Sequence, residues 1–327
     1  MRKINGRLST LGAVALLLAA VGCGSSSGGS QGTGGTSGGT GGASGTGGTT
    51  PGTGGTSPGT GGTTPGTGGT PATGGTSGTG GTSMDASVEV AADAPTQKMN
   101  VLAIAELGMD PHVPFVNAAK PWLMTFAAAN NMTITFVESG DNITDAMLAN
   151  VNLILQLNYR PYLYKAAAQA AIQKYLTDGT GGWIGLHHAA LYGPDFPMTY
   201  PWYQTNLLGG SSYKNYIATF AQANVKVEDM AHPLFKDVPA TFAVVKEEWY
   251  TWDKTPRPNV HVLATVDENS YMPNSTIKMN GDHPVVWTND KLKGRNAYIF
   301  MGHDPNLFDN TSWVQLFKNA ILWGGGR

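Results

Sequence analysis

The chain has 327 residues, 45 of them glycine, and its 20 basic and 22 acidic side chains give a formal net charge of −2. No basic block stands out beyond the N-terminus, so the charge pattern of a nucleic-acid-binding protein is missing and we expect no such partner. The single cysteine, Cys23, excludes a disulfide within the chain and a cysteine nucleophile elsewhere in it.

The N-terminus has the pattern of an export signal. Basic residues precede an apolar run over 11–21, which is too short to span a bilayer as a permanent helix. The run closes on Ala-Val-Gly directly before Cys23, as a bacterial lipobox does; an ordinary secretory signal is the alternative. We therefore predict a lipoprotein signal peptide over 1–22, lipidation of Cys23, and an exported protein anchored to the membrane, with the outer membrane as the expected location.

Residues 23–97 form a Gly/Thr/Ser-rich segment with few apolar side chains to bury. Such a composition cannot offset the entropy of ordering, which predicts a disordered tether. From residue 98 the composition changes, and all eight tryptophans lie beyond this point. We expect one globular domain over 98–327, which is long enough to bury a core.

The first half of this domain alternates between strands and helices. Strands are predicted over 99–106, 133–138, 153–157 and 182–186, with helices over 118–130, 144–151 and 162–176 between them. This order predicts an α/β fold with a parallel sheet and helices on both faces. Further strands over 220–227, 242–252, 260–266, 285–288 and 297–301 should partly extend the sheet and partly form an antiparallel flap, before a last helix over 313–323.

Three histidines follow strand ends that could share one edge of the sheet. His112 lies in the loop after the first strand, His187 ends the fourth strand, and His303 follows the last one. His187 also ends a glycine-flanked strand that leads to a sharp turn, where an imidazole can be a general base, an oxyanion donor or a metal ligand. The alternative is a histidine that only packs the turn, and we expect the next residue, His188, to point to the opposite side in a structural role.

An acidic residue among aromatic side chains is the next candidate. Glu247 and Glu248 precede a Trp-Tyr-Thr-Trp run, an environment that favours a raised pKa and acid–base chemistry; a surface strand with acidic side chains is the alternative. His232, before a proline, could close the site or cap its turn.

Four aromatic side chains could offer flat apolar faces to the C–H surface of a sugar ring. They are Trp202, Tyr203, Trp249 and Trp287. Core filling always competes with such a role for large aromatic residues.

Several common catalytic motifs are missing from the sequence. It has no G-x-x-x-x-G-K-[ST] phosphate loop, no G-x-G-x-x-G after the first strand, no G-x-S-x-G elbow and no H-E-x-x-H. A nucleotide-dependent enzyme, a serine hydrolase of the elbow type and the commonest zinc protease are therefore not expected.

The segment Gly-Gly-Trp-Ile-Gly-Leu-His-His-Ala over 181–189 resembles the signature of the ThuA-like, or trehalose-utilisation, family. Four further motifs agree in order, around Trp202 to Gly210, His232 to Tyr250, Pro284 to Trp287, and Gly302 to Asp304. The resemblance spans about 99–325. It implies a flavodoxin-like, class I glutamine amidotransferase-like three-layer sandwich, with a mostly parallel sheet and an antiparallel extension.

The resemblance also implies a site. His187 would stand where amidotransferases have their nucleophilic cysteine, which excludes glutamine hydrolysis through a thioester. The pocket residues would be His112, His187, His232, Glu248 and His303, in a family linked to sugar catabolism. Many relatives have another histidine shortly after the glycine pair that ends at Gly210, and this chain has none there.

We therefore expect a carbohydrate-active enzyme, a hydrolase or lyase, that uses His187, His303, Glu248 and His112. A divalent metal such as zinc on His112, His187 and His303 is one mechanism left open, beside metal-free acid–base catalysis. The partners expected are a sugar-derived small molecule and, through the lipid anchor, a membrane. A tethered sugar-binding module without turnover and a purely structural surface protein are the alternatives.

Overall fold

The computed structural model describes residues 97–327 except 106, 108–111, 218 and 272–274. The predicted signal peptide, Cys23 and the tether up to residue 96 lie outside the described residues, so those statements stay predictions. No helix in the described part of the chain is long and apolar enough to cross a membrane.

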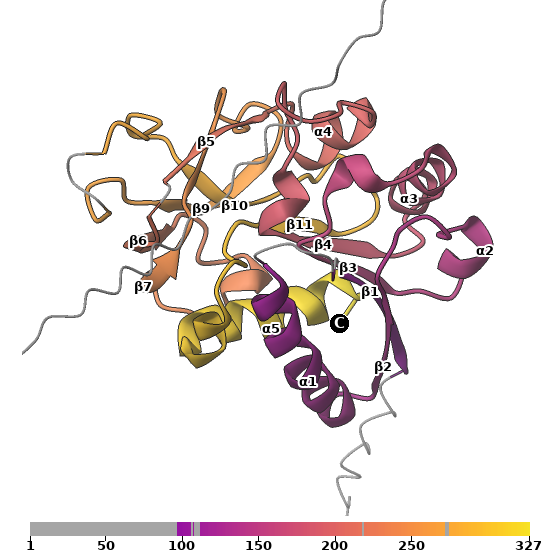
Figure 1. Cartoon of the computed structure of the whole chain (residues 1–327). Helices are drawn as coiled ribbons and strands as arrows, with labels where there is room; N and C mark the ends of the chain where they lie inside the picture. The colour runs from indigo at the N-terminus through magenta and orange to yellow at the C-terminus, as the bar shows by residue number, and fades with distance from the viewer. Residues whose placement is uncertain (1–96, 106, 108–111, 218, 272–274) are drawn as a thin grey trace, which may run out of the picture. The chain divides into compact units, whose positions relative to one another are not determined.

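One nine-stranded sheet forms the centre of the domain, in the order β2-β1-β3-β4-β11-β10-β9-β6-β7 (Figure 1). Its first half is parallel, as the sequence predicts. The parallel strands are β1 (Met99–Ala105), β2 (Met132–Val137), β3 (Leu153–Leu157), β4 (Gly182–Leu186) and β11 (Asn296–Ile299). β3 and β4 are buried at every position, because a strand covered on both faces needs apolar or small side chains throughout.

The second half of the sheet is antiparallel and begins where β10 pairs with β11. Its strands are β10 (Pro284–Thr288), β9 (His261–Val266), β6 (Ala221–Val227) and β7 (Thr241–Glu247). A separate two-stranded ribbon consists of β5 (Tyr213–Tyr216) and β8 (Tyr250–Trp252). The single strand predicted over 242–252 is therefore two strands that pair with different partners.

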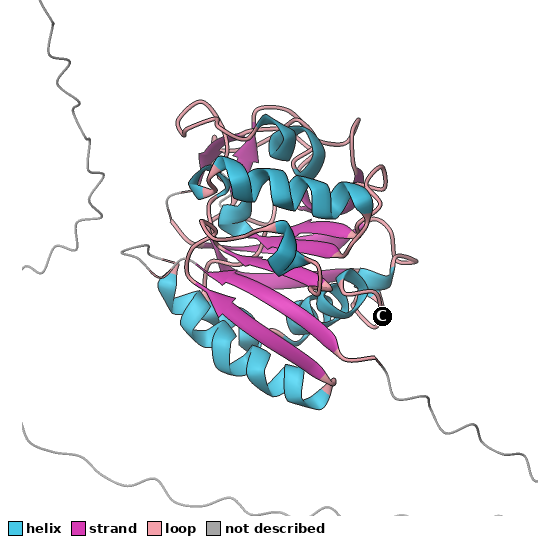
Figure 2. Cartoon of the chain, turned by 90° about the vertical axis from the view of Figure 1, so that its right-hand side faces the viewer, coloured by secondary structure: helices cyan, strands magenta, loops and turns pink. Residues whose placement is uncertain are grey.

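Helices lie on both sides of the sheet, with α1 on one side and α3 on the other (Figure 2). They are α1 (Val113–Ala129), α2 (Asp145–Leu148), α3 (Ala166–Asp178), α4 (Pro201–Leu207) and α5 (Thr311–Gly324). The short 3-10 helices of the described residues are η1 (Pro161–Leu163), η2 (His187–Ala190), η3 (Pro233–Phe235) and η4 (Pro305–Asp309). The expected α/β sandwich with an antiparallel extension is confirmed, whereas α4 and β5 were not predicted and α1 begins five residues earlier than expected.

Glycines in β4 allow close packing around the strand that leads to the site. A Cβ at Gly182 would lie 2.1 Å from the carbonyl oxygen of Gly324, at the end of α5, and 2.7 Å from that of Arg295. A Cβ at Gly185 would lie 2.2 Å from the ring of Trp183. At both positions a Cβ would be closer to its neighbours than van der Waals contact allows, so β4 can pack this tightly only with glycine there.

Candidate active site

Four side chains meet at the carboxyl ends of the parallel strands. His112 precedes α1, His187 follows β4, and His303 follows β11, while Glu248 arrives from the antiparallel half, directly after β7. One ligand atom from each of the four lies within 4.8 Å of the others. We call these four residues the His–Glu cluster.

The Glu248 carboxylate is the centre of the His–Glu cluster. Its Oε2 atom lies 3.5 Å from Nε2 of His187, 3.8 Å from Nε2 of His112 and 4.0 Å from Nε2 of His303. The ring centroids of His112 and His303 are 4.1 Å apart, and those of His112 and His187 are 4.9 Å apart. The sequence-based expectation that the strand-end histidines converge thus agrees with their placement in the structure.

His187 occupies a strained turn. It begins η2 immediately after β4 with a φ of 44°, in the left-handed region that only a few per cent of residues other than glycine adopt, histidine more often than most. Such a residue costs of the order of 1–3 kcal/mol and persists only where its surroundings over-determine it. Here the hydroxyl of Tyr298 donates to the His187 carbonyl oxygen at 2.9 Å and holds the backbone in place.

The tautomer of His187 follows from its partners. Its Nδ1 lies 3.1 Å from the carbonyl oxygen of Phe300, which can only accept, so Nδ1 carries the proton and donates. Nε2 then has a lone pair directed at the cluster, where it accepts from the Tyr250 hydroxyl at 3.0 Å. A histidine whose outer nitrogen donates to a backbone carbonyl is the arrangement found for most metal-ligating histidines.

Burial keeps His187 and His303 neutral. The ring of His187 is fully buried, and burial, together with the neighbouring imidazoles, lowers its pKa well below the ordinary value, although its protonated form could donate to Glu248. Burial and the adjacent imidazole of His112 lower the pKa of His303 to about 4. Burial alone would raise the pKa of Glu248, but the nearby imidazoles of His112 and His187 lower it well below the usual range. At neutral pH the cluster therefore presents the neutral imidazoles of His187 and His303 beside the Glu248 carboxylate.

Glu247 supports the cluster from behind, with its Oε1 atom 3.7 Å from Nδ1 of His187. Its side chain is completely buried, and its carboxyl accepts from the backbone N–H of Glu248 at 2.9 Å, Gly302 at 3.0 Å and His303 at 3.4 Å. Burial, opposed by these hydrogen bonds, raises the pKa of this carboxyl to about 8. Of the two adjacent acids singled out in the sequence, Glu248 faces the histidines and Glu247 ties the end of β7 to the loop after β11.

A second buried pair holds the strand that presents Tyr250. Nδ1 of His283 lies 3.0 Å from the Glu268 carboxylate, and its Nε2 lies 2.6 Å from the Tyr250 carbonyl oxygen. Glu268 also accepts from the backbone N–H of Gly281 at 3.0 Å and from that of Met279. His283 therefore anchors β8 against the loop between β9 and β10.

The predicted aromatic ligand surface is not present as a set. Trp249, Trp287 and Tyr203 are completely buried, and each uses its polar atom inside the protein, on the carbonyl oxygens of Ala221, Leu207 and Ala189 respectively. These three side chains therefore fill the core and do not offer a surface to a ligand. Trp202 is only partly buried and stacks on Tyr200 at 6.0 Å.

His232 is not brought to the His–Glu cluster. Its Nδ1 accepts from the backbone N–H of Leu234 at 3.2 Å, which makes it the cap of η3, and its ring packs on Trp323 at 5.0 Å. Burial lowers its pKa. Of the two roles that the sequence left open for this residue, the structure shows the cap.

Two neighbours of the cluster differ from the sequence-based prediction: His188 was expected to point away from it, and Asn158 was not singled out. The ring of His188 lies 3.5 Å from that of His112, between centroids, and so is turned toward the cluster. Asn158 donates to the Gly302 carbonyl oxygen at 2.7 Å and accepts from the His188 backbone N–H at 3.4 Å. It directly follows β3, so the same strand-end rule that found the histidines could have found it.

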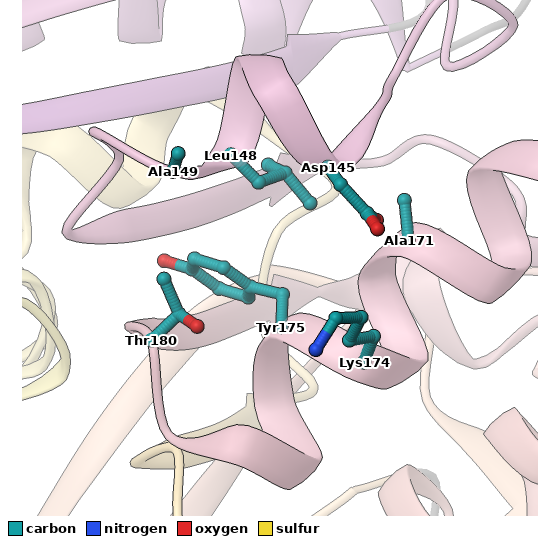
Figure 3. Close-up of a pocket in the computed structure, with 7 residues that line it drawn as sticks. All are labelled: Asp145, Leu148, Ala149, Ala171, Lys174, Tyr175 and Thr180. Atoms are coloured by element: carbon teal, nitrogen blue, oxygen red, sulfur yellow. The ribbon is translucent and has the colours of Figure 1, made fainter.

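A surface pocket elsewhere has no matching chemistry. It lies between α2 and α3, has a volume of about 260 Å³, and is lined by Asp145, Leu148, Ala149, Ala171, Lys174, Tyr175 and Thr180 (Figure 3). Its one cation, Lys174, pairs with Asp178 one turn along α3. No residue of the His–Glu cluster lines it, so the cluster and not this pocket is the candidate active site.

The fold and the turn at His187 define a class I glutamine amidotransferase-like domain with an imidazole at the end of its fourth strand. The family model described as ThuA, trehalose utilisation, matches residues 100–324, and the chain belongs to this family.

Two solved structures of relatives are similar to it. A putative ThuA-like protein from Bacteroides uniformis has 27% identity and a TM-score of 0.62, over 71% of this chain and 92% of that one. A putative ThuA-like protein from Parabacteroides merdae has 16% identity and a TM-score of 0.51, over 70% and 91% of the two chains, and shows the fold alone. No curated protein matched the chain.

Proposed function

We propose that this chain is an exported, lipid-anchored enzyme of carbohydrate catabolism whose catalytic centre is the His–Glu cluster with a divalent cation bound in it. The observation that carries the proposal is the convergence of three imidazoles on one partly buried carboxylate oxygen, at 3.5–4.0 Å. The family's description as trehalose utilisation supports a sugar as the substrate.

The donor set suits a divalent cation such as zinc. Imidazole nitrogens and a carboxylate oxygen are its usual ligands, at about 2.0–2.1 Å, which places neighbouring ligands of a tetrahedral site about 3.4 Å apart. The three contacts of Glu248 are close to this separation, so a small contraction of the cluster would complete the site. The Phe300 carbonyl already orients His187 from its outer side.

A cation at this position would polarise an oxygen of the substrate, which both hydrolysis and β-elimination of a sugar require. The chain's own contribution is a proton donor and acceptors beside it. The Tyr250 hydroxyl lies 3.0 Å from Nε2 of His187, and burial raises its pKa well above the ordinary value, so it stays protonated and can donate. Glu248 supplies the negative charge of the site.

Metal analysis of the full-length chain, purified with a tag that contains no histidine, tests the proposal directly. We expect close to one equivalent of a divalent metal in the wild type and its loss in His187→Ala. His261→Ala is the matched control, because His261 is a half-exposed histidine beside Asp229 and Asp290 and outside the cluster. An absence of metal in the wild type would refute the metal-assisted mechanism, and sugar turnover that survives in His187→Ala would refute the catalytic assignment.

The anchor has its own support and its own test. The apolar run over 11–21 that closes directly before Cys23 supports lipidation, and the Gly/Thr/Ser-rich segment after it supports a tether between membrane and domain. Labelled fatty acid should be incorporated into the wild-type chain in cells and not into Cys23→Ser. Equal labelling of both would refute this part of the proposal.

A further inference from the structure

Phe220 is an exposed aromatic side chain at the border of the His–Glu cluster. The exposed large apolar side chains of the described residues are Phe220 and four aliphatic ones, Met124, Met198, Met230 and Val245. Phe220 keeps 42% of its surface accessible. A single exposed apolar side chain is common on a protein surface, so what sets Phe220 apart is where its ring lies.

The strand register places Phe220 at the site. It immediately precedes β6, whose first residue, Ala221, pairs with Glu247 at the end of β7. Its ring centroid lies 4.5 Å from that of His303, with the two planes at 56°. The exposed ring therefore borders one imidazole of the cluster directly.

A charged pair flanks the same ring. The ammonium group of Lys246 lies 5.2 Å from the centre of the Phe220 ring and 2.6 Å from Oδ2 of Asp304. The other carboxylate oxygen of Asp304 accepts from the backbone N–H of Asn306 at 3.0 Å, which fixes the orientation of the carboxylate. The side chain of Lys246 is 44% exposed and that of Asp304 is 8% exposed, so the pair reaches solvent through the ammonium group.

We propose that Phe220, Lys246 and Asp304 form a subsite for a pyranose ring. A pyranose has a face of C–H groups, which packs on an aromatic ring, and hydroxyl groups at its rim that both donate and accept hydrogen bonds. The ammonium group of Lys246 supplies donors and the Asp304 carboxylate supplies an acceptor, side by side at the edge of the ring. This inference rests on the proposed function, since it names the substrate surface of that catalytic centre: a sugar stacked on Phe220 extends toward His303.

The subsite replaces the aromatic set predicted from the sequence, most of which is in the core. It also makes a distinction among ligands that hydroxyl recognition alone would not make. A cyclic sugar offers a flat C–H face to Phe220, whereas an open-chain polyol with similar hydroxyl groups does not. Cyclic sugars should therefore bind and mannitol should not.

The test is binding of trehalose, methyl α-glucoside, methyl β-galactoside, methyl α-mannoside and mannitol to the full-length chain, by calorimetry and saturation-transfer NMR. We expect the wild type to bind at least one cyclic sugar, Phe220→Ala to weaken that binding about tenfold or more, and Phe220→Trp to retain it within about threefold. Lys246→Met should weaken the same ligand several-fold. Val245→Ala is the matched control, since Val245 is an exposed apolar residue next to Lys246, with 58% of its surface accessible, and should bind as the wild type does.

Two results would overturn the subsite: equal sugar affinity of Phe220→Ala and Val245→Ala, or a wild type that binds no cyclic sugar more tightly than mannitol. Metal content measured on the same preparations separates this failure from that of the proposed function. If the protein holds its full complement of metal and Phe220→Ala does not change sugar binding, only the subsite is refuted. If the wild type binds no metal but Phe220→Ala weakens sugar binding, the metal centre is refuted and the subsite is supported.

Discussion

The left-handed backbone of His187 predicts an inverted order of stability for two variants at this position. His187→Ala and His187→Gly remove the same ring, with its bonds to the Phe300 carbonyl and the Tyr250 hydroxyl, so they lose the same side-chain interactions. They differ in the backbone alone. Alanine must still adopt a φ near 44°, whereas glycine does so without a steric penalty.

The magnitude follows from two opposing terms. A residue with a Cβ costs roughly 1–2 kcal/mol in the left-handed region. Glycine loses about 0.5–1 kcal/mol through its greater freedom in the unfolded chain. We therefore expect His187→Gly to be more stable than His187→Ala by about 0.5–1 kcal/mol, although both are less stable than a chain that keeps the buried ring.

Urea unfolding in the presence of a chelator measures the difference without a contribution from bound metal. The exposed helical residue Ala170 on α3 is the control, because Ala170→Gly should lose about 1 kcal/mol in the ordinary direction. If His187→Ala proved as stable as His187→Gly or more so, the turn would not be strained and the reasoning from its φ angle would be refuted.

Three further predictions concern the support of the site. Burial opposes ionisation of Glu268, but its bonds with His283 and the backbone of Met279 and Gly281 hold its pKa at about 2, below the ordinary 4.5. Because the folded-state pKa is lowered, the pair stabilises the protein above pH 4.5, and this contribution of up to about 3 kcal/mol is lost as the pH falls toward 2. In urea titrations, Glu268→Gln should lose less unfolding free energy than the wild type between pH 4.5 and 2. Parallel pH dependences of the two proteins would contradict the assignment. Gly182→Ala should lower the unfolding free energy by about 2 kcal/mol or more, because its Cβ would collide with the Gly324 carbonyl oxygen, and an unchanged urea midpoint would disprove the close packing. Tyr250→Phe should cost about 1 kcal/mol, since the buried Nε2 of His187 loses its donor, and a metal-free variant as stable as wild type would show that this bond contributes nothing.

The parallel half of the fold was predictable because its signals are local. β3 and β4 match the predicted ranges, since short apolar runs bounded by turn residues define strands that are buried on both faces. The three histidines could be assigned to one edge because parallel strands carry their loops to the same end. Residues 242–252 were predicted as one strand because the charged residues over 246–248 can also continue a strand. Only the pairing with β6 and with β5 separates β7 from β8.

Side-chain roles were less predictable than positions. Nothing in the sequence distinguishes a tryptophan that faces a ligand from one such as Trp249, which stacks on Phe300 at 5.4 Å inside the core. Phe220 lay within a predicted strand, so its exposed position could not be seen before the start of β6 was known. Long-range bonds such as those of Glu247 join segments more than 50 residues apart, and a local pattern cannot indicate them.

The division of the sheet into two halves has a consequence for motion. The carboxylate of Glu248 comes from the antiparallel half and the imidazoles from the parallel half, and the Glu247 carboxyl joins the two through the backbone N–H groups of Gly302 and His303. A local opening at this junction would separate carboxylate from imidazoles while each half stays folded. Hydrogen exchange at the amides of Gly302 and His303 would report that opening directly. The rate of the opening would limit how quickly carboxylate and imidazoles can separate and come together again in the native protein.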